Sequence, residues 1–558
     1  MRKIKKQFLL GSCLIFSVSL IAQINTEVTL FAPEIISNGK VFGLTLSPDG
    51  NKAYFVNSFG GRKKLQIMQS EKLNGHWQAP IPAFFSDRKF REIDPIVAAD
   101  GNAILYNSRK SNRHKATDDK DLDIWMVKRN NGKWSKPFPV AEINSDENET
   151  YATMAANGNI YFGLRSNKKG YGGNDIYMSR LVEGKYQSPI NLGYPINTKN
   201  DEGNSFIAAD ESYIIFSSDC NPSGFGQADL YISFNENGRW SVPLNLGAEI
   251  NSAQNDFCPI IFNQDTLIFA RSEKVGDDLT ENIYYARINI PFLTALDKVK
   301  PTSVFDKVFP DGDVYGISFS PDGKHAYTTK SAADRSVCEI YQLDIGPDGS
   351  FINPKKMDIW QITPNVANPV ISTDGTFAML RISETGKDPD LYISKKDLLG
   401  NWQQPVRLPE NINTPTDQYY PELTAENGLY YSSSGAVFYA EYKNRQWQNP
   451  EPVEGLNTKD FSESNIAVSR DGKWLVFLSN RTGVYGAYDL FLCKKSAECW
   501  SEPINLGSKI NTNAMEYQPR FSIDNKTLYF TRSVFTDAKR QGRDEVLKVE
   551  IGEVLDKL

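Results

Sequence analysis

The stretch Leu44-Thr-Leu-Ser-Pro-Asp-Gly-Asn-Lys-Ala-Tyr-Phe55 determines the fold that we expect for this chain. It contains a strand-like run, a Ser-Pro-Asp-Gly turn and a second run with alternating apolar residues, which together are typical of a β-hairpin. The pattern recurs along the chain at intervals of about 50 residues, and such a period indicates a repeat architecture. The turn residues that mark the ten copies are Asp49, Asp100, Asn157, Asp210, Asn263, Asp322, Asp374, Asn427, Asp471 and Asp524.

Each unit continues with two further strand-like runs. The third run begins with Asp, as in Asp175-Ile-Tyr-Met-Ser and Asp229-Leu-Tyr-Ile-Ser. The fourth begins with Trp and a nearby Pro, as in Trp77-Gln-Ala-Pro and Trp240-Ser-Val-Pro. Four short antiparallel strands joined by tight turns are the content of one β-propeller blade. We therefore predict an all-β fold.

Three features together resemble the TolB-type, WD40-like (PD40) β-propeller repeats of bacterial envelope proteins. They are the Ser-Pro-Asp-Gly turn, the Asp-hydrophobic-Tyr strand and the run Trp-Ser-x-Pro-x-Asn-Leu-Gly-x-x-Ile-Asn, which occurs at Trp240 and again at Trp500. The resemblance covers nearly all of the chain after its first residues. It implies a propeller fold and almost nothing about function.

The ends of the two halves predict how the repeats divide. The fifth unit ends at residues 282–288 without a fourth strand, and the tenth unit ends in the same way. Each half begins with an extra strand-like segment, residues 27–31 in one half and 303–309 in the other. An N-terminal strand that completes the last blade leaves no open sheet edge. We expect two tandem five-bladed propellers, residues 24–293 and 299–558.

The first residues indicate a secretory signal peptide over residues 1–22. A basic start is followed by an apolar run from Phe8 to Ala22, which is shorter than the roughly 20 residues of a membrane-spanning helix. We expect cleavage after Ala22 and a periplasmic or secreted protein. A permanent anchor and lipidation at Cys13 are the alternatives. No later segment is long and apolar enough to predict a membrane span.

Charge and cysteine content exclude some classes of function. The formal net charge of -6 over 558 residues gives no reason to expect a nucleic acid partner. The cysteines lack the spacing of a metal-thiolate site. Cys493 and Cys499 flank a short turn between strand-like runs, and in an oxidising compartment we predict a disulfide between them.

Candidate site residues lie in the loops that lead from the outermost strand of one blade to the innermost strand of the next. These loops surround one mouth of a propeller's channel, where carboxylates at matching positions would converge. Such a group suits Ca²⁺ or, as a pair, cleavage of a glycosidic bond; alternatively, each carboxylate caps its own turn. The candidate ligand-binding residues are Glu92, Asp94, Glu147, Asp201, Glu202 and Asp256, of which Glu92, Asp94 and Glu202 are also the candidate catalytic residues.

The second half keeps few of these carboxylates, so a site is expected in the first. The three histidines, His76, His114 and His325, lie in surface-like contexts, which disfavours a Ser-His-Asp site. The leading hypothesis is a binding scaffold for an envelope protein or a glycan at the ring mouth, with no cofactor unless Ca²⁺ binds there. The alternative is a glycoside hydrolase or polysaccharide lyase. A subunit of a secretion or gliding apparatus would differ from the scaffold only in its partner.

Overall fold

The computed structural model is all-β, as predicted: nearly all of its regular secondary structure is β-strand. It describes residues 27–110, 121–166, 170–219, 224–276, 278–310, 313–332, 336–384, 388–496, 499–535 and 542–558. The predicted signal peptide and His114 lie outside these residues. In the described part of the chain, no helix is long and apolar enough to cross a membrane.

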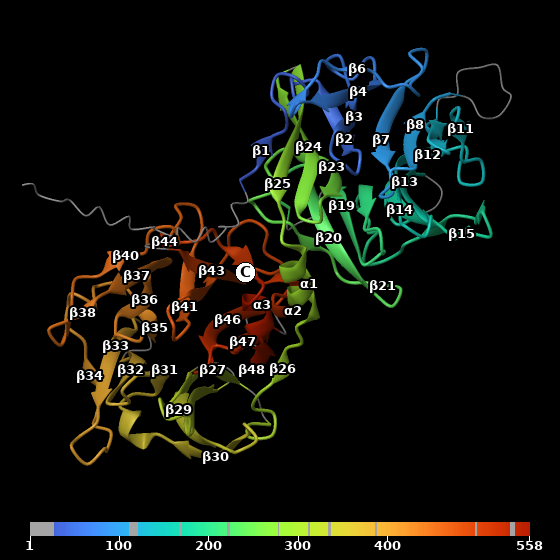
Figure 1. The fold of residues 1–558 in the computed structure, drawn as a ribbon. Coiled ribbons are helices and arrows are strands. Elements are labelled where there is room, and N and C mark those ends of the chain that lie inside the picture. The colour runs from blue at the N-terminus through green and yellow to red at the C-terminus, as the bar shows by residue number, and fades with distance from the viewer. Residues whose placement is uncertain are drawn as a thin grey trace, which may run out of the picture.

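Five groups of antiparallel strands, each called a sheet below, form the first half of the chain (blue to green in Figure 1). One parallel pair joins the fourth sheet to the fifth, at Ala228 and Asn255, and another joins the sixth to the seventh, at Cys338 and Asn365. The first sheet contains β2 (Val41–Leu46), β3 (Lys52–Asn57), β4 (Gln66–Leu73), β5 (His76–Trp77) and β6 (Ile81–Pro82), and the second contains β7 (Glu92–Val97), β8 (Ala103–Ser108), β9 (Asp123–Asn130), β10 (Lys133–Trp134) and β11 (Phe138–Pro139). The third contains β12 (Asn148–Met154), β13 (Ile160–Arg165), β14 (Asn174–Ser179) and β17 (Ile190–Asn191), with the hairpin of β15 (Leu181–Val182) and β16 (Lys185–Tyr186). The fourth contains β18 (Glu202–Ile207), β19 (Tyr213–Asp219), β20 (Ala228–Glu236), β21 (Arg239–Trp240) and β22 (Leu244–Asn245), and the fifth contains β23 (Asn255–Phe262), β24 (Thr266–Val275), β25 (Asp278–Arg287) and β1 (Thr29–Leu30).

The second half repeats this order (yellow to red in Figure 1). The sixth sheet contains β27 (Val314–Phe319), β28 (His325–Ser331), β29 (Cys338–Ile345) and β30 (Phe351–Lys356), and the seventh contains β31 (Asn365–Ile371), β32 (Phe377–Ser383), β33 (Asp390–Lys395) and β34 (Val406–Arg407). The eighth contains β35 (Tyr419–Leu423), β36 (Leu429–Ser433), β37 (Ala436–Ala440) and β40 (Glu451–Pro452), with the hairpin of β38 (Tyr442–Lys443) and β39 (Gln446–Trp447). The ninth contains β41 (Glu463–Val468), β42 (Trp474–Ser479), β43 (Asp489–Ser496), β44 (Cys499–Trp500) and β45 (Ile504–Asn505), and the tenth contains β46 (Met515–Phe521), β47 (Thr527–Phe535), β48 (Gly542–Glu550) and β26 (Thr302–Ser303).

An N-terminal strand completes the last sheet of each half, which confirms the predicted pairing. β1 pairs antiparallel with β25, where Thr29 faces Tyr285, and β26 pairs with β48, where Thr302 faces Lys548. The innermost strands also pack against one another: β2 contacts β23, and β27 contacts β46. Each half therefore has a propeller-like arrangement in which its first and last sheets meet.

The predicted fourth strand is broken into two pieces in several sheets. In the first sheet, β5 pairs Trp77 with Lys72, and β6 pairs Pro82 with Met68. Pro80 lies between the two pieces and has no backbone N–H to donate to the sheet. The recurring Trp therefore belongs to a hairpin that extends beyond the sheet, and the residues after the Pro form the outer edge.

A helix joins the two halves, where the sequence predicted only a linker. Helix α1 (Ile290–Lys298) begins at Asn289, whose side-chain oxygen accepts a hydrogen bond from the N–H of Phe292. Leu296 and Phe292 are buried in the same cluster as residues of α2 (Gly507–Ile510) and α3 (Gly552–Leu555). The three helices lie between the halves in Figure 1. The short 3₁₀ helix η1 spans Asp358–Trp360.

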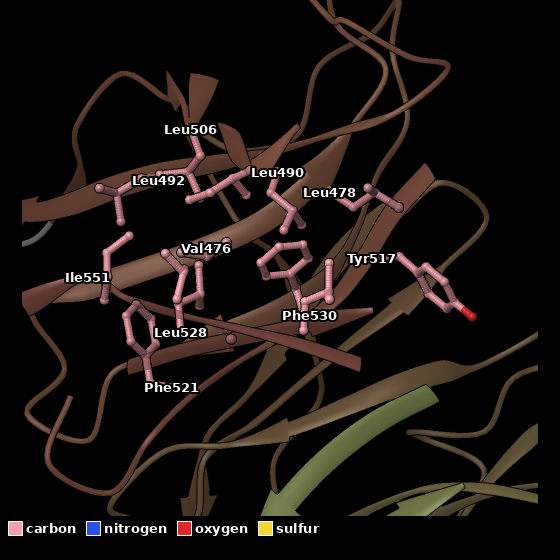
Figure 2. Packing of buried hydrophobic residues seen from close by; sticks show 14 of the residues in the cluster. Val476, Leu478, Leu490, Leu492, Leu506, Tyr517, Phe521, Leu528, Phe530 and Ile551 are labelled. Carbon is pink, nitrogen blue, oxygen red and sulfur yellow. The ribbon is translucent and has the colours of Figure 1, made fainter. Parts of the chain in front are cut away.

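Apolar side chains from neighbouring sheets form a series of cores. Figure 2 shows part of the cluster between the ninth and tenth sheets, where side chains of β42 and β43 pack against those of β46 and β47. Alternate residues point into this layer, as Val476 and Leu478 do, because successive side chains of a strand face opposite sides.

The predicted disulfide between Cys493 and Cys499 is wrong: both cysteines are unpaired. Cys493 is buried and faces Leu475 across the sheet, whereas Cys499 is exposed and pairs with Ser496 in a hairpin beyond the sheet. The two side chains therefore lie in different environments, one in the core and one in solvent.

Candidate functional site

Every innermost strand carries a β-bulge near its middle. One residue of each bulge has a left-handed backbone, with φ between +46° and +66°, and the pairing register shifts there. A bulge re-aims a side chain that would otherwise follow the alternation of the strand. The bulge residues are Gly43, Asp94, Tyr151, Asn204 and Cys258 in the first half, and Gly316, Asn368, Tyr420, Asn465 and Gln518 in the second.

The bulge residues of the first half gather around the channel axis. A side chain at Gly43 would contact Asp94 Oδ1 and Cys258 Sγ, at 3.6 and 3.8 Å from its Cβ. The hydroxyl of Tyr151 donates to the backbone oxygen of Pro259, 2.9 Å away on another sheet. Burial raises the pKa of Asp94 to about 7. Asp94 is thus the one predicted carboxylate that the structure places in this ring.

The sequence contains a signal for these bulges that pattern reasoning missed. Proline directly follows the bulge residue in five of the ten innermost strands, where it cannot donate to the ladder. These prolines are Pro95, Pro259, Pro369, Pro421 and Pro519.

The other predicted carboxylates at the strand starts hold their own loops. Glu202 is buried, and its Oε2 accepts a hydrogen bond from the N–H of Thr198 at 2.8 Å. Its Oε1 accepts from the hydroxyls of Thr198 and Ser218, at 2.6 and 3.1 Å. Burial raises the pKa of Glu202 to about 6. Its position and contacts are those of a turn cap.

The same cap recurs in the neighbouring sheets. Glu92 accepts from the Ser86 hydroxyl at 2.7 Å, and Asp256 accepts from the Ser252 hydroxyl at 2.8 Å. In the third sheet the cap is Glu149, which bonds with Ser145. Burial raises the pKa of Glu92 and of Glu149 to about 7, and it also raises the pKa of Asp256, although Arg271 opposes that rise.

Glu147 and Asp201 lie outside these caps. Glu147 is half-buried and accepts from the Ser166 hydroxyl at 3.4 Å, while Asp201 forms an ion pair with Arg165 at 2.6 Å. Among the residues that the structure describes, no three Asp, Glu, His or Cys side chains gather as metal ligands do. The hydrogen bonds and ion pairs that the structure gives these carboxylates are with hydroxyl, backbone N–H and arginine groups and not with one another, and their convergence on a ligand stays a prediction.

A cavity of about 1320 Å³ lies at the opposite end of the first half, at the C-terminal ends of its innermost strands. Linker residues 287–291 form part of its wall. The predicted carboxylates lie at the N-terminal ends of the same strands and do not line it. All five sheets contribute apolar side chains to the cavity, among them Leu46, Val97, Met154, Phe206 and Ile261.

The corresponding end of the second half is much narrower, with a cavity of about 100 Å³. Glu422 and Arg520 line it and form a buried ion pair, and burial lowers the pKa of Arg520 to about 10. The matching strand positions of the first half hold Thr153 and Ile260. The two halves thus share a backbone pattern but differ in the space that they enclose.

Neither of the two histidines that the structure describes contributes to an end of the first half. His76 is exposed in the hairpin of β4 and β5, and His325 lies 3.0 Å from Asp344 in the second half.

Comparisons with known proteins gave only weak similarities to solved structures. No protein-family model matches the chain, and no curated protein matches it. TolB from Acinetobacter baumannii is 11% identical, with 72% of this chain and 80% of that chain covered and a TM-score of 0.26. An endo-arabinase from Bacteroides thetaiotaomicron is 13% identical, with 46% and 96% covered and a TM-score of 0.32. A thermostable family-43 glycoside hydrolase is 10% identical, with 42% and 88% covered and a TM-score of 0.31. These scores are too low to carry fold or function over to this chain.

Proposed function

We propose that the protein is a secreted or periplasmic binding scaffold, made of two five-bladed propellers over residues 24–293 and 299–558, in the manner of TolB-type repeats. Its ligand is an envelope protein or a glycan, and the first propeller binds it at a channel end. The cavity of about 1320 Å³ carries this proposal. It is somewhat larger than the roughly 300–1,000 Å³ of typical ligand sites, and its wall is mainly apolar with a few polar groups.

The arrangement of carboxylates favours binding over catalysis. A glycoside hydrolase needs two carboxyl groups about 5–10 Å apart on either side of the scissile bond. Glu92 and Glu202, the candidates for such a pair with Asp94, are buried and accept hydrogen bonds from their own loops. None of the three lines the cavity. No cofactor is part of this proposal.

A cavity-blocking experiment tests the proposal. Ala99 and Ala209 are exposed residues that line the cavity, so Ala99→Trp and Ala209→Trp narrow it without overpacking the core. Ala425→Trp is the matched control, because Ala425 occupies the same kind of turn in the second half. The wild type and the three variants are screened on a glycan array and a panel of purified muropeptides, and hits are quantified by calorimetry.

Loss of binding in both first-half variants, with binding kept in Ala425→Trp, is the expected result. Binding that all three variants retain would overturn the proposed location. Release of shortened glycans from the array would show that the protein is an enzyme, which is the alternative.

A further inference from the structure

Three arginines lie together at the end of the first half that faces away from the large cavity. Arg62 belongs to the loop between β3 and β4, Arg91 directly precedes β7, and Arg109 directly follows β8. The backbone N–H of Arg109 donates to the backbone oxygen of Arg91 at 3.1 Å, so these two residues are neighbours across the second sheet. At this end of the channel, the start of β7 lies beside the end of β8.

Two of these guanidinium groups have an Nε atom without a hydrogen-bond partner among the described residues. The Nε atoms of Arg91 and Arg109 are buried, and neither has a hydrogen-bond partner in the part of the chain that the structure describes. Burial lowers the pKa of Arg91, and the charges of Arg109 and Arg62 lower it further. A buried donor without an acceptor is costly, and three like charges repel one another. A bound anion would relieve both costs.

Arg62 is held in place by groups that do not neutralise the other two arginines. It forms an ion pair with the buried Glu281 at 2.6 Å, and its guanidinium lies 4.7 Å from the centre of the Phe42 ring. Asp94 is a further carboxylate close to Arg91, and burial raises its pKa to about 7, so that only part of the Asp94 carboxyl groups carry a charge near neutral pH. The mouth is therefore locally positive although the whole chain is acidic.

Three arginines on the same face of other sheets differ from Arg91 and Arg109, because each is paired with the cap carboxylate at the start of the innermost strand of its own sheet. These pairs are Arg271 with Asp256 at 2.7 Å, Arg481 with Glu463 at 3.2 Å, and Arg532 with Glu516 at 2.7 Å.

We propose that Arg62, Arg91 and Arg109 form a second binding site, which takes the carboxylate of a uronic acid residue in an acidic glycan. This site goes beyond the cavity described above and does not depend on it. Guanidinium groups bind planar carboxylates through paired hydrogen bonds. Phe59 lies in the same loop as Arg62 and is 49% exposed, so its ring offers a flat apolar surface on which a sugar ring can pack.

The test compares ligands that differ in charge and in backbone. Calorimetry measures binding of trigalacturonate, of neutral galactotriose and of a triglutamate peptide to the full chain. Trigalacturonate is expected to bind at least about tenfold more tightly than either of the others, with weaker binding at higher salt. Equal binding of galactotriose would overturn the anion site, and tighter binding of the peptide would overturn its assignment to a sugar.

Variants identify the residues. Arg91→Gln and Arg109→Gln are each expected to weaken trigalacturonate binding about tenfold or more. Arg165→Gln is the matched control, because Arg165 occupies the same position in the third sheet as Arg109 does in the second. Each arginine directly follows the residue that pairs with the cap glutamate, which is Leu164 opposite Glu149 and Ser108 opposite Glu92. Unlike Arg109, Arg165 is ion-paired with Asp201. Arg165→Gln is expected to leave binding unchanged.

The folding of each variant is checked by thermal melting. Should Arg91→Gln fail to fold, Arg91→Lys keeps the charge but removes the paired donors, and it is expected to weaken binding as well. Wild-type affinity in Arg91→Lys and Arg109→Gln, or an equal loss in Arg165→Gln, would overturn the assignment. Ala209→Trp blocks the cavity at the other end and is expected to leave trigalacturonate binding intact. The proposed cavity site and the proposed arginine site can therefore be refuted independently.

Discussion

The substitution Glu202→Ala tests whether the buried carboxylates at the strand starts hold their loops. It removes three hydrogen bonds, from the N–H and hydroxyl of Thr198 and from the hydroxyl of Ser218. At about 1.5 kcal/mol each, the low end for bonds to a charged group, their loss amounts to about 4.5 kcal/mol. Burial raises the pKa of Glu202 to about 6 even with these bonds present, so the charged carboxylate gains less from them than their sum. The expected net loss of stability is about 2–3 kcal/mol.

A second substitution serves as the control, and the chain itself provides its precedent. Gln418 occupies the matching position of the eighth sheet, where its side-chain amide donates to the Thr414 hydroxyl at 2.8 Å. Glu202→Gln is therefore expected to cost less than about 1 kcal/mol. Urea unfolding gives the stability, and hydrogen exchange of the peptide that covers residues 198–218 reports on the loop. If Glu202→Ala left both measurements unchanged, the cap would be refuted and the carboxylate would be available for a site.

Further outcomes follow from the same contacts. Because burial raises the pKa of Glu149 to about 7, the folded protein holds a proton on Glu149 that the unfolded chain releases, and the stability of the fold falls as the pH rises from about 4.5 to about 7. Glu149→Gln removes this titration and should reduce the fall in stability by at most about 3 kcal/mol. Urea unfolding at several pH values across that range measures it. A thiol reagent should modify Cys499 in the folded protein and Cys493 only after unfolding, as peptide mapping would show; equal rates would contradict their assigned environments. Leu296→Ala should cost about 2–5 kcal/mol in calorimetric unfolding, because α1 packs its Leu296 into the core shared with α2 and α3, and an unchanged transition would contradict that packing. Removal of residues 27–31 should lower the melting temperature of the first half, because β1 covers the edge of β25; no change would mean that the edge needs no partner.

The sequence predicted the strand order within each repeat well because short local patterns specify it. Asp-Gly turns and alternating strands specify each hairpin without reference to the rest of the chain. The missing fourth strand in the units that end near residues 288 and 551 was enough to predict that β1 and β26 would supply it. Helix α1 was missed because its nine residues, with Pro291 near the start, lie between two repeats and follow no repeat pattern. Its apolar residues are buried by α2 and α3, which come more than 200 residues later in the sequence.

The site was harder to predict because it depends on where side chains point. Sequence reasoning assigned Glu92 and Glu202 to the channel, but a hydroxyl residue four to six positions earlier binds each of them. That Ser or Thr was visible in the sequence and, read as a cap, would have identified the carboxylates as structural. The cavity could not be predicted, since its volume depends on how five strand ends and a linker pack together.

Comparison of the two halves separates what the fold requires from what it leaves open. Both halves carry the left-handed bulge, and both carry cap residues at their strand starts, so these features belong to the architecture. The ion pair of Glu422 and Arg520 lies at the channel end of the second half, where the first half has Thr153 and Ile260 and a cavity about thirteen times as large by the ratio of 1320 to 100 Å³. Arg91 and Arg109, whose buried Nε atoms have no partner among the described residues, also lie in the first half; Arg520 of the second half has such an Nε atom too, but its guanidinium is ion-paired with Glu422. Because folding alone demands neither the open channel end nor the arginine cluster, the ligand binding that we propose for the first half would account for both.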